Sequence, residues 1–125
     1  MKKFDYKRAR QFLERKEQER EIFLDERYNQ ACIAFQKIVK IIIEGYNPKR
    51  IYQWGSLLNR KHFSEISDID IAVEGVTSAE EIFKLYGEII KITHFSVDLI
   101  QLEKIEPEFA ELIKEKGKVV YERRG

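Results

Sequence analysis

Three aspartates interrupt otherwise apolar stretches of the chain, at positions where they could share one surface. Asp68 and Asp70 lie two residues apart in "ISDIDIAV", residues 66–73, and Asp98 lies in "FSVDLI", residues 95–100. Residues i and i+2 of a strand point to the same face, so the first two aspartates should lie together, opposite the isoleucines. Two carboxylates ~5 Å apart repel by roughly 3 kcal/mol at an effective dielectric constant near 20. Either water bathes this face or a cation binds there.

A glycine–serine pair, Gly55-Ser56, follows the short apolar segment 50–54 and has the residue types of a phosphate-binding turn. Glycine lets the backbone approach a phosphate, whose oxygens can be held by backbone N–H groups and the serine hydroxyl. Carboxylate oxygens suit Mg²⁺, which takes further ligands from phosphates. If the strand with Asp98 pairs with the strand of the other two acids, three carboxylates converge beside this turn. The set predicts a site for phosphoryl or nucleotidyl transfer.

Apolar periodicity predicts the elements that must position these residues. Residues 5–44 contain neither Gly nor Pro, and apolar residues recur at three- and four-residue steps from Leu24 to Ile42, which indicates an amphipathic helix. The polar stretch 14–21 either continues this helix or marks a break between two helices. The expected later elements are strands at 50–54, 66–74, 95–100 and 118–122, and helices at 78–93 and 107–116.

The composition of the whole chain limits the classes of function. The 125 residues suit one domain, and a 43% apolar content argues against disorder. A net charge of +1 provides no general electrostatic basis for binding nucleic acid. Cys32 is the only cysteine, which excludes an intrachain disulfide framework and zinc-finger spacing. No stretch reaches the ~18 apolar residues of a membrane span, and no signal peptide is visible. We therefore expect a cytoplasmic protein without nucleic-acid or membrane partners.

The order of the candidate residues resembles a known superfamily. Gly55-Ser56, then eleven residues, then Asp68-Ile69-Asp70, then the later strand acid Asp98 is similar to the DNA polymerase β nucleotidyltransferases. The short chain points to the minimal nucleotidyltransferases (MNT), and the resemblance covers about residues 50–123. It implies an α+β (α/β) fold with a polymerase β-like core, a small mixed sheet with helices packed on one face, and a long N-terminal helical segment before it.

The resemblance also implies roles for the three acids. In the family the first two acids bind both metal ions, and the third assists activation of the attacking hydroxyl. Asp68, Asp70 and Asp98 are therefore the expected catalytic and metal-binding residues, with two Mg²⁺ ions and ATP as the substrate.

On the phosphate side, the resemblance assigns nucleotide binding to Gly55 and Ser56. The family places an arginine where this chain has Asn59. Arg60 and Lys61 are the candidates to supply the missing cation. The alternative is that both are ordinary polar residues of a loop.

The family's biology implies a partner. Minimal nucleotidyltransferases are commonly paired with HEPN-domain proteins in toxin–antitoxin modules, where the transferase is the antitoxin and adds AMP to a tyrosine of the HEPN ribonuclease. We therefore expect a Mg-dependent protein adenylyltransferase. Two alternatives stay open. A binding-only antitoxin with a vestigial site is favoured by Asn59 and opposed by the complete set of acids. A small-molecule or RNA nucleotidyltransferase is opposed by the near-zero net charge and the lack of an acceptor domain.

The N-terminal and C-terminal parts of the chain should have different functions. We expect residues 1–45 to form an N-terminal helical extension and residues 46–125 the nucleotidyltransferase domain, packed as one globular unit. The stripe from Leu24 to Ile42 should cover the apolar face of the sheet and leave the acidic face open. Residues 5–20 carry too many charges to be buried and should meet the partner or a second copy of the chain through Phe4, Phe12 and Leu13.

Overall fold

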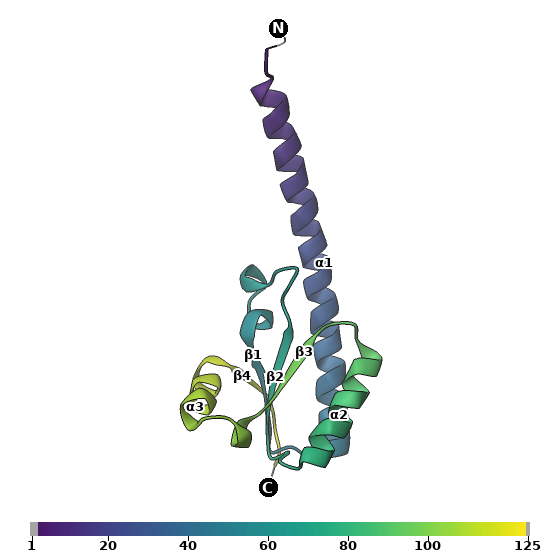
Figure 1. Ribbon diagram of the computed structural model, residues 1–125, viewed down its shortest axis with the longest axis vertical. Coiled ribbons are helices and arrows are strands. Elements are labelled where there is room, and N and C mark those ends of the chain that lie inside the picture. Colours follow the sequence, from purple (N-terminus) through teal and green to yellow (C-terminus); the bar gives the residue numbers. More distant parts are fainter. Residues whose placement is uncertain (1–2, 125) are drawn as a thin grey trace.

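A computed structural model describes residues 3–124; residues 1–2 and 125, the outer ends of the two expected parts, lie outside the described residues. A small sheet has one long helix and a second helix on one side and a third helix on the other (Figure 1). The main elements are α1 (Tyr6–Tyr46), β1 (Arg50–Trp54), β2 (Ile69–Glu74), α2 (Ala79–Ile92), β3 (Val97–Gln101), α3 (Pro107–Lys116) and β4 (Lys118–Glu122). Short 3₁₀ turns are η1 (Gly55–Leu58), η2 (Arg60–His62) and η3 (Leu102–Lys104).

The sheet is mixed, with strand order β3-β2-β1-β4. β1 pairs antiparallel with both β2 and β4, whereas β2 pairs parallel with β3. A parallel pair needs a crossover connection, and α2 provides it. The predicted pairing of the two acid-bearing strands is therefore confirmed, as is the α+β class with a mixed sheet.

Each face of the sheet has its own core because successive strand residues point to opposite sides. α1 and α2 cover one face, where the buried strand residues are Ile51, Ile69, Ile71, Val73 and Val97. The expectation of helices on one face holds for these two helices, but α3 packs on the other face. Small and aromatic residues on that face give α3 a second, smaller core, made of Tyr52, Ala72, Leu102, Ala110 and Ile113.

α1 is a single helix of 41 residues, about 60 Å long at 1.5 Å per residue. Asp5 caps its start by accepting a hydrogen bond from the Arg8 N–H at 3.0 Å. The polar stretch 14–21 thus continues the helix rather than breaking it. The helix passes through Gly45 and ends at Asn47, which adopts a left-handed conformation with φ 46°.

Only the second half of α1 contributes to the core. Its buried residues are Leu24, Ala31, Ala34, Phe35, Ile38, Val39, Ile42 and Tyr46. Residues 10–23 are all exposed, and this half of the helix projects beyond the sheet (Figure 1). The predicted division between a packed stripe and a surface segment is confirmed. No helix in residues 3–124 is both long and apolar enough to cross a membrane.

The second strand begins later than predicted. Residues 64–67 form a turn in which the Ser67 N–H donates to the Ser64 carbonyl at 3.2 Å and the Ser64 N–H donates to Ser67 Oγ at 2.8 Å. These bonds occupy groups that a strand would pair with its neighbour, and the Ile66 side chain is left 91% exposed. Asp68 consequently lies just before β2 instead of inside it.

Candidate active site

The register of β2 and β3 places two of the three aspartates side by side. Asp70 is directly opposite Asp98 in the parallel pair, so both side chains point to the same face of the sheet. This is the face of Ala72, which α3 covers farther along the strands. The acids lie at the end of the sheet where β1 ends and β2 and β3 begin, and there Asp98 is exposed and Asp70 is only partly buried.

The electrostatics of this pair indicate a site that favours a cation. Burial, followed by the charges of Asp98 and Asp68, raises the pKa of Asp70 from 3.8 to about 6. A cation bound here removes the repulsion that opposes ionisation of Asp70. Carboxylate oxygens are also the donor type that Mg²⁺ prefers. The residues therefore fit a hard divalent cation.

Asp68 contributes less directly than its two partners. It is exposed ahead of β2, yet near enough for its charge to act on Asp70. Within residues 3–124, no group of three or more His, Cys, Asp or Glu side chains is arranged to hold a metal ion. The structure thus brings Asp70 and Asp98 together and places Asp68 beside them. The three side chains do not form the three-ligand cluster that the sequence predicted.

Gly55 lies against the acid pair. Its φ of +80° is in the left-handed region, and a Cβ at this position would be 2.1 Å from Asp70 Oδ2. Both observations require glycine, because any side chain would displace the carboxylate. Trp54 pairs with Asp70 across β1 and β2, so the chain passes from the strand directly into the η1 turn next to the acids. Gly55 and Ser56 therefore open a turn beside the candidate cation site.

The loop cations predicted from the sequence lie in a different arrangement. Arg60 Nε donates to Asp25 Oδ1 at 2.6 Å, and Arg60 Nη2 lies 3.3 Å from Glu21 Oε2. Both acids belong to α1, so the guanidinium is paired with the long helix. Asn59 caps the η2 turn by accepting the Lys61 N–H at 3.0 Å, and the Lys61 side chain is exposed. The structure does not bring Arg60 to the acid pair.

The α1 residues that contact this loop were missed by sequence reasoning. Asp25 and Tyr28 lie in the segment predicted to form the amphipathic helix, and the spacing of that helix assigns neither of them a contact with the loop. The Tyr28 hydroxyl in fact donates to the Leu57 carbonyl at 3.0 Å. Nothing in the spacing of α1 relates it to residues 55–63; the opposite charges of Asp25 and Arg60 were the one available signal.

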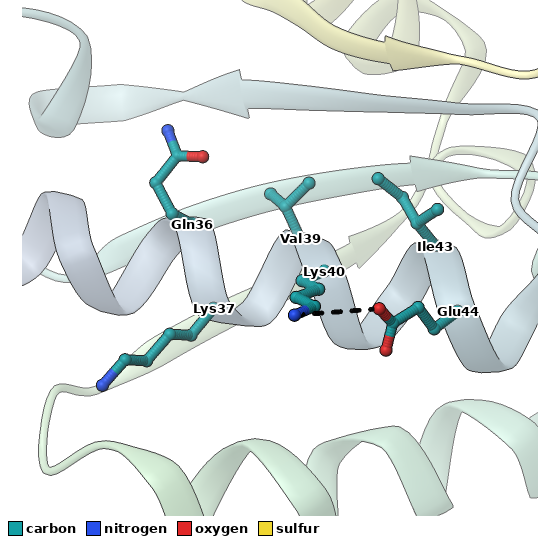
Figure 2. Close-up of a pocket in the computed structure, with 6 residues that line it drawn as sticks. All are labelled: Gln36, Lys37, Val39, Lys40, Ile43 and Glu44. Atoms are coloured by element: carbon teal, nitrogen blue, oxygen red, sulfur yellow. Dashed lines mark ion pairs between the residues drawn. The ribbon is translucent and has the colours of Figure 1, made fainter.

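A separate hollow lies along α1, away from the acid pair. Figure 2 shows that its lining side chains all come from this helix and that Lys40 and Glu44 form an ion pair. Lys40 Nζ lies 4.0 Å from Glu44 Oε1. The other lining residues are Gln36, Lys37, Val39 and Ile43. This hollow has a single carboxylate, which is paired with a lysine. It therefore lacks the ligands for a cation that the acid pair offers, and the acid pair remains the candidate site.

Comparison with known families identifies the fold around this site. Residues 36–124 match the family "Polymerase beta, Nucleotidyltransferase". The chain belongs to this nucleotidyltransferase family. The matched span begins within α1 and includes the Gly55–Ser56 turn and all three aspartates. No match is found among curated proteins.

Solved structures share the nucleotidyltransferase fold. One is a chain in the crystal structure of the toxin–antitoxin MntA-HepT, with 21% identity and a TM-score of 0.56, covering 73% of this chain and 72% of that one. Another is a chain in a toxin–antitoxin crystal structure with AMP-PNP, with 24% identity and a TM-score of 0.59, covering 71% and 73%. At these identities the likeness establishes the fold alone.

Proposed function

We propose that this nucleotidyltransferase is a Mg²⁺-dependent protein adenylyltransferase that acts as the antitoxin of a HEPN ribonuclease. The observation that carries the proposal is the Asp70–Asp98 pair with the Gly55 turn against it. Two carboxylates lie beside a glycine turn, and a nucleotidyl-transfer site requires ligands for a cation next to a turn that can bind phosphate. The solved MntA-HepT and AMP-PNP complexes with this fold support a protein partner and an adenine nucleotide.

Each site residue has a task in this reaction. Asp70 and Asp98, with Asp68 beside them, would hold Mg²⁺, which when bound neutralises charge on the phosphates. The Gly55 and Ser56 N–H groups and the serine hydroxyl would bind phosphate oxygens. The acceptor hydroxyl oxygen forms a bond to the α-phosphorus, the bond to pyrophosphate breaks, and the hydroxyl proton is lost. The Asp98 carboxylate, which is exposed on the edge strand β3, would accept that proton.

Two features of the surface favour a macromolecular acceptor. Asp98 is exposed on an edge strand, so a second protein can approach it from the side. The projecting half of α1 also exposes large apolar side chains, which are concentrated at protein interfaces. Those side chains are Tyr6, Phe12, Leu13, Ile22 and Phe23, and Phe4 is exposed just before the helix begins.

Transfer of label tests the proposal. The protein is incubated with Mg²⁺, ATP labelled at the α-phosphate, and a HEPN protein encoded beside it. We expect label on a tyrosine of the HEPN protein, no label with Asp70→Asn, and unchanged labelling with the control Asp5→Asn, which keeps a capping side chain at the far end of α1. Absence of label with the wild type, or equal labelling by Asp70→Asn, contradicts the proposal.

A binding-only antitoxin is the second candidate, favoured by one observation. The loop position that carries an arginine in the family is Asn59, and the adjacent Arg60 is paired with α1. If this candidate is correct, Asp70→Asn neutralises the toxin as well as the wild type does. Label appearing on RNA or on a small molecule instead would indicate the third alternative.

A further inference from the structure

The Gly55–Ser56 turn is held from outside the sheet by the long helix. The Leu57 carbonyl, within η1, accepts hydrogen bonds from the Tyr28 hydroxyl at 3.0 Å and from Gln53 Nε2 at 3.4 Å. The Leu57 side chain is fully buried in the core shared with α1. β1 fixes the turn at the start of η1, and Tyr28 fixes it two residues later.

The loop that follows the turn is attached to the same stretch of α1. The Tyr28 ring packs edge-on against Phe63, with centroids 5.4 Å apart. Arg60 pairs with Asp25 and Glu21. Glu21, Asp25 and Tyr28 are spaced i, i+4 and i+7, so they form one stripe on the helix. One face of α1 thus contacts residues 57–63 at several points.

We propose that this stripe of α1, Glu21, Asp25 and Tyr28, positions the turn for nucleotide binding, with the Tyr28 hydroxyl as the contact to the turn itself. The inference rests on the proposed function and adds positioning residues to it. The space at the turn is narrow, because a Cβ on Gly55 would lie 2.1 Å from Asp70 Oδ2. A shift of about 1 Å in such a site can lower the rate about 100-fold. The distance from the η1 N–H groups to the acid pair therefore depends on the helix contacts.

The same helix provides a matched control. The Tyr46 hydroxyl donates to Glu88 Oε2 at 3.1 Å, a contact between α1 and α2 that does not involve the loop. Tyr28→Phe and Tyr46→Phe each remove one hydroxyl and keep the ring. If Tyr28 only stabilises the fold, the two variants differ in melting temperature at most, and nucleotide affinity stays the same in both.

Nucleotide affinity and hydrogen exchange together test the proposal. We expect Tyr28→Phe to weaken binding of Mg²⁺–AMP-PNP about fivefold, the effect of one hydrogen bond, and Tyr46→Phe to leave it unchanged. Amide exchange in residues 55–63 should accelerate only in Tyr28→Phe. Faster exchange without loss of affinity, or no change in exchange, overturns the proposal. If the wild type binds no nucleotide, the proposed function fails, whereas the exchange data still decide whether Tyr28 holds the turn.

Asp25 and Arg60 form the second arm of the test. If Arg60 acts through α1, Asp25→Asn and Arg60→Ala each weaken nucleotide binding, and the double variant is no weaker than the worse single one. If Arg60 instead binds phosphate when freed, Asp25→Asn leaves affinity unchanged or raises it. That result overturns the assignment of Arg60 to the stripe.

Discussion

The two faces of the sheet serve opposite purposes, although the same strands build both. On the face covered by α1 and α2, β2 contributes Ile69, Ile71 and Val73, all fully buried. On the other face β2 contributes Asp70, partly buried beside Asp98, and α3 covers only the rest of that face. The face under α1 and α2 stabilises the fold by burying apolar side chains. The opposite face keeps two carboxylates that repel each other, which does not favour folding. Adjacent residues of one strand should therefore respond oppositely to substitution.

The largest expected effect on stability lies on the packed face. Ile71→Ala leaves a cavity under two helices and should lower the free energy of unfolding by about 2–5 kcal/mol. Asp70→Asn, one residue away, should not lower it. Urea unfolding of both variants without divalent ions measures the contrast, and similar losses for the two would remove the distinction between the faces.

The largest expected effect on activity lies at the turn. Gly55→Ala forces a Cβ into the Asp70 carboxylate and strains a residue with φ +80°. We expect a loss of nucleotidyl transfer of about 100-fold or more, since the turn and the acids can no longer keep their spacing. Gly45→Ala is the control, because nothing lies within 4 Å of a Cβ there. An active Gly55→Ala enzyme would show that this contact is dispensable.

Binding of a metal–nucleotide complex should offset the charge repulsion between the aspartates on the acidic face. Mg²⁺–AMP-PNP at 100 times its Kd should stabilise the wild type by about 2.7 kcal/mol. Asp70→Asn should show a much smaller rise in melting temperature, because a cation ligand is missing. Equal thermal shifts in the two proteins would exclude Asp70 from the cation site.

The pH dependence of stability sharpens the comparison further. The pKa of Asp70 is raised from 3.8 to about 6, so between these values the folded protein holds the proton more tightly than the unfolded chain. Without metal, stability should fall as the pH rises through this range, and the penalty persists above it. Asp70→Asn should therefore be more stable than the wild type at pH 7.5, by about 1 kcal/mol or less given solvent screening, and indistinguishable from it below pH 4. An equal difference at both pH values would show that ionisation is not the cause.

The smallest expected effect on stability belongs to the projecting half of α1. Deleting residues 1–20 leaves both hydrophobic cores intact, because residues 3–20 contribute no side chain to them. It also leaves Glu21, Asp25 and Tyr28 in place, so nucleotide binding should be unchanged. Association with the partner or with a second copy should weaken. A full-length variant with Phe12→Ala and Leu13→Ala separates loss of these side chains from loss of the helix. A truncated chain that fails to fold, or that keeps full partner affinity, contradicts this division.

Local structure could be predicted because local interactions determine it. The three- and four-residue spacing of the apolar residues predicted α1. The predicted helix at 78–93 is α2, which Ser78 caps by accepting the Glu81 N–H at 3.2 Å. Alternation along β2 correctly placed Asp70 on the face opposite Ile71. The errors lie at boundaries, where competing local bonds decide. The turn at residues 64–67 delays β2, and α1 runs past the expected boundary at residue 45 to Tyr46, where the left-handed Asn47 ends it.

The sequence by itself determined the helices, the strands, the face on which Asp70 lies and the family to which the motif belongs. The tertiary structure decided the partners of those residues. The parallel register sets Asp98 beside Asp70, Gly55 closes onto the carboxylate, and α1 binds the loop through Tyr28. Side-chain spacing encodes which way a residue points, because it repeats every two or 3.6 residues. Contacts between distant segments follow no such period, so Arg60 could be recognised as a free cation or as a partner of Asp25 only after the chain had folded.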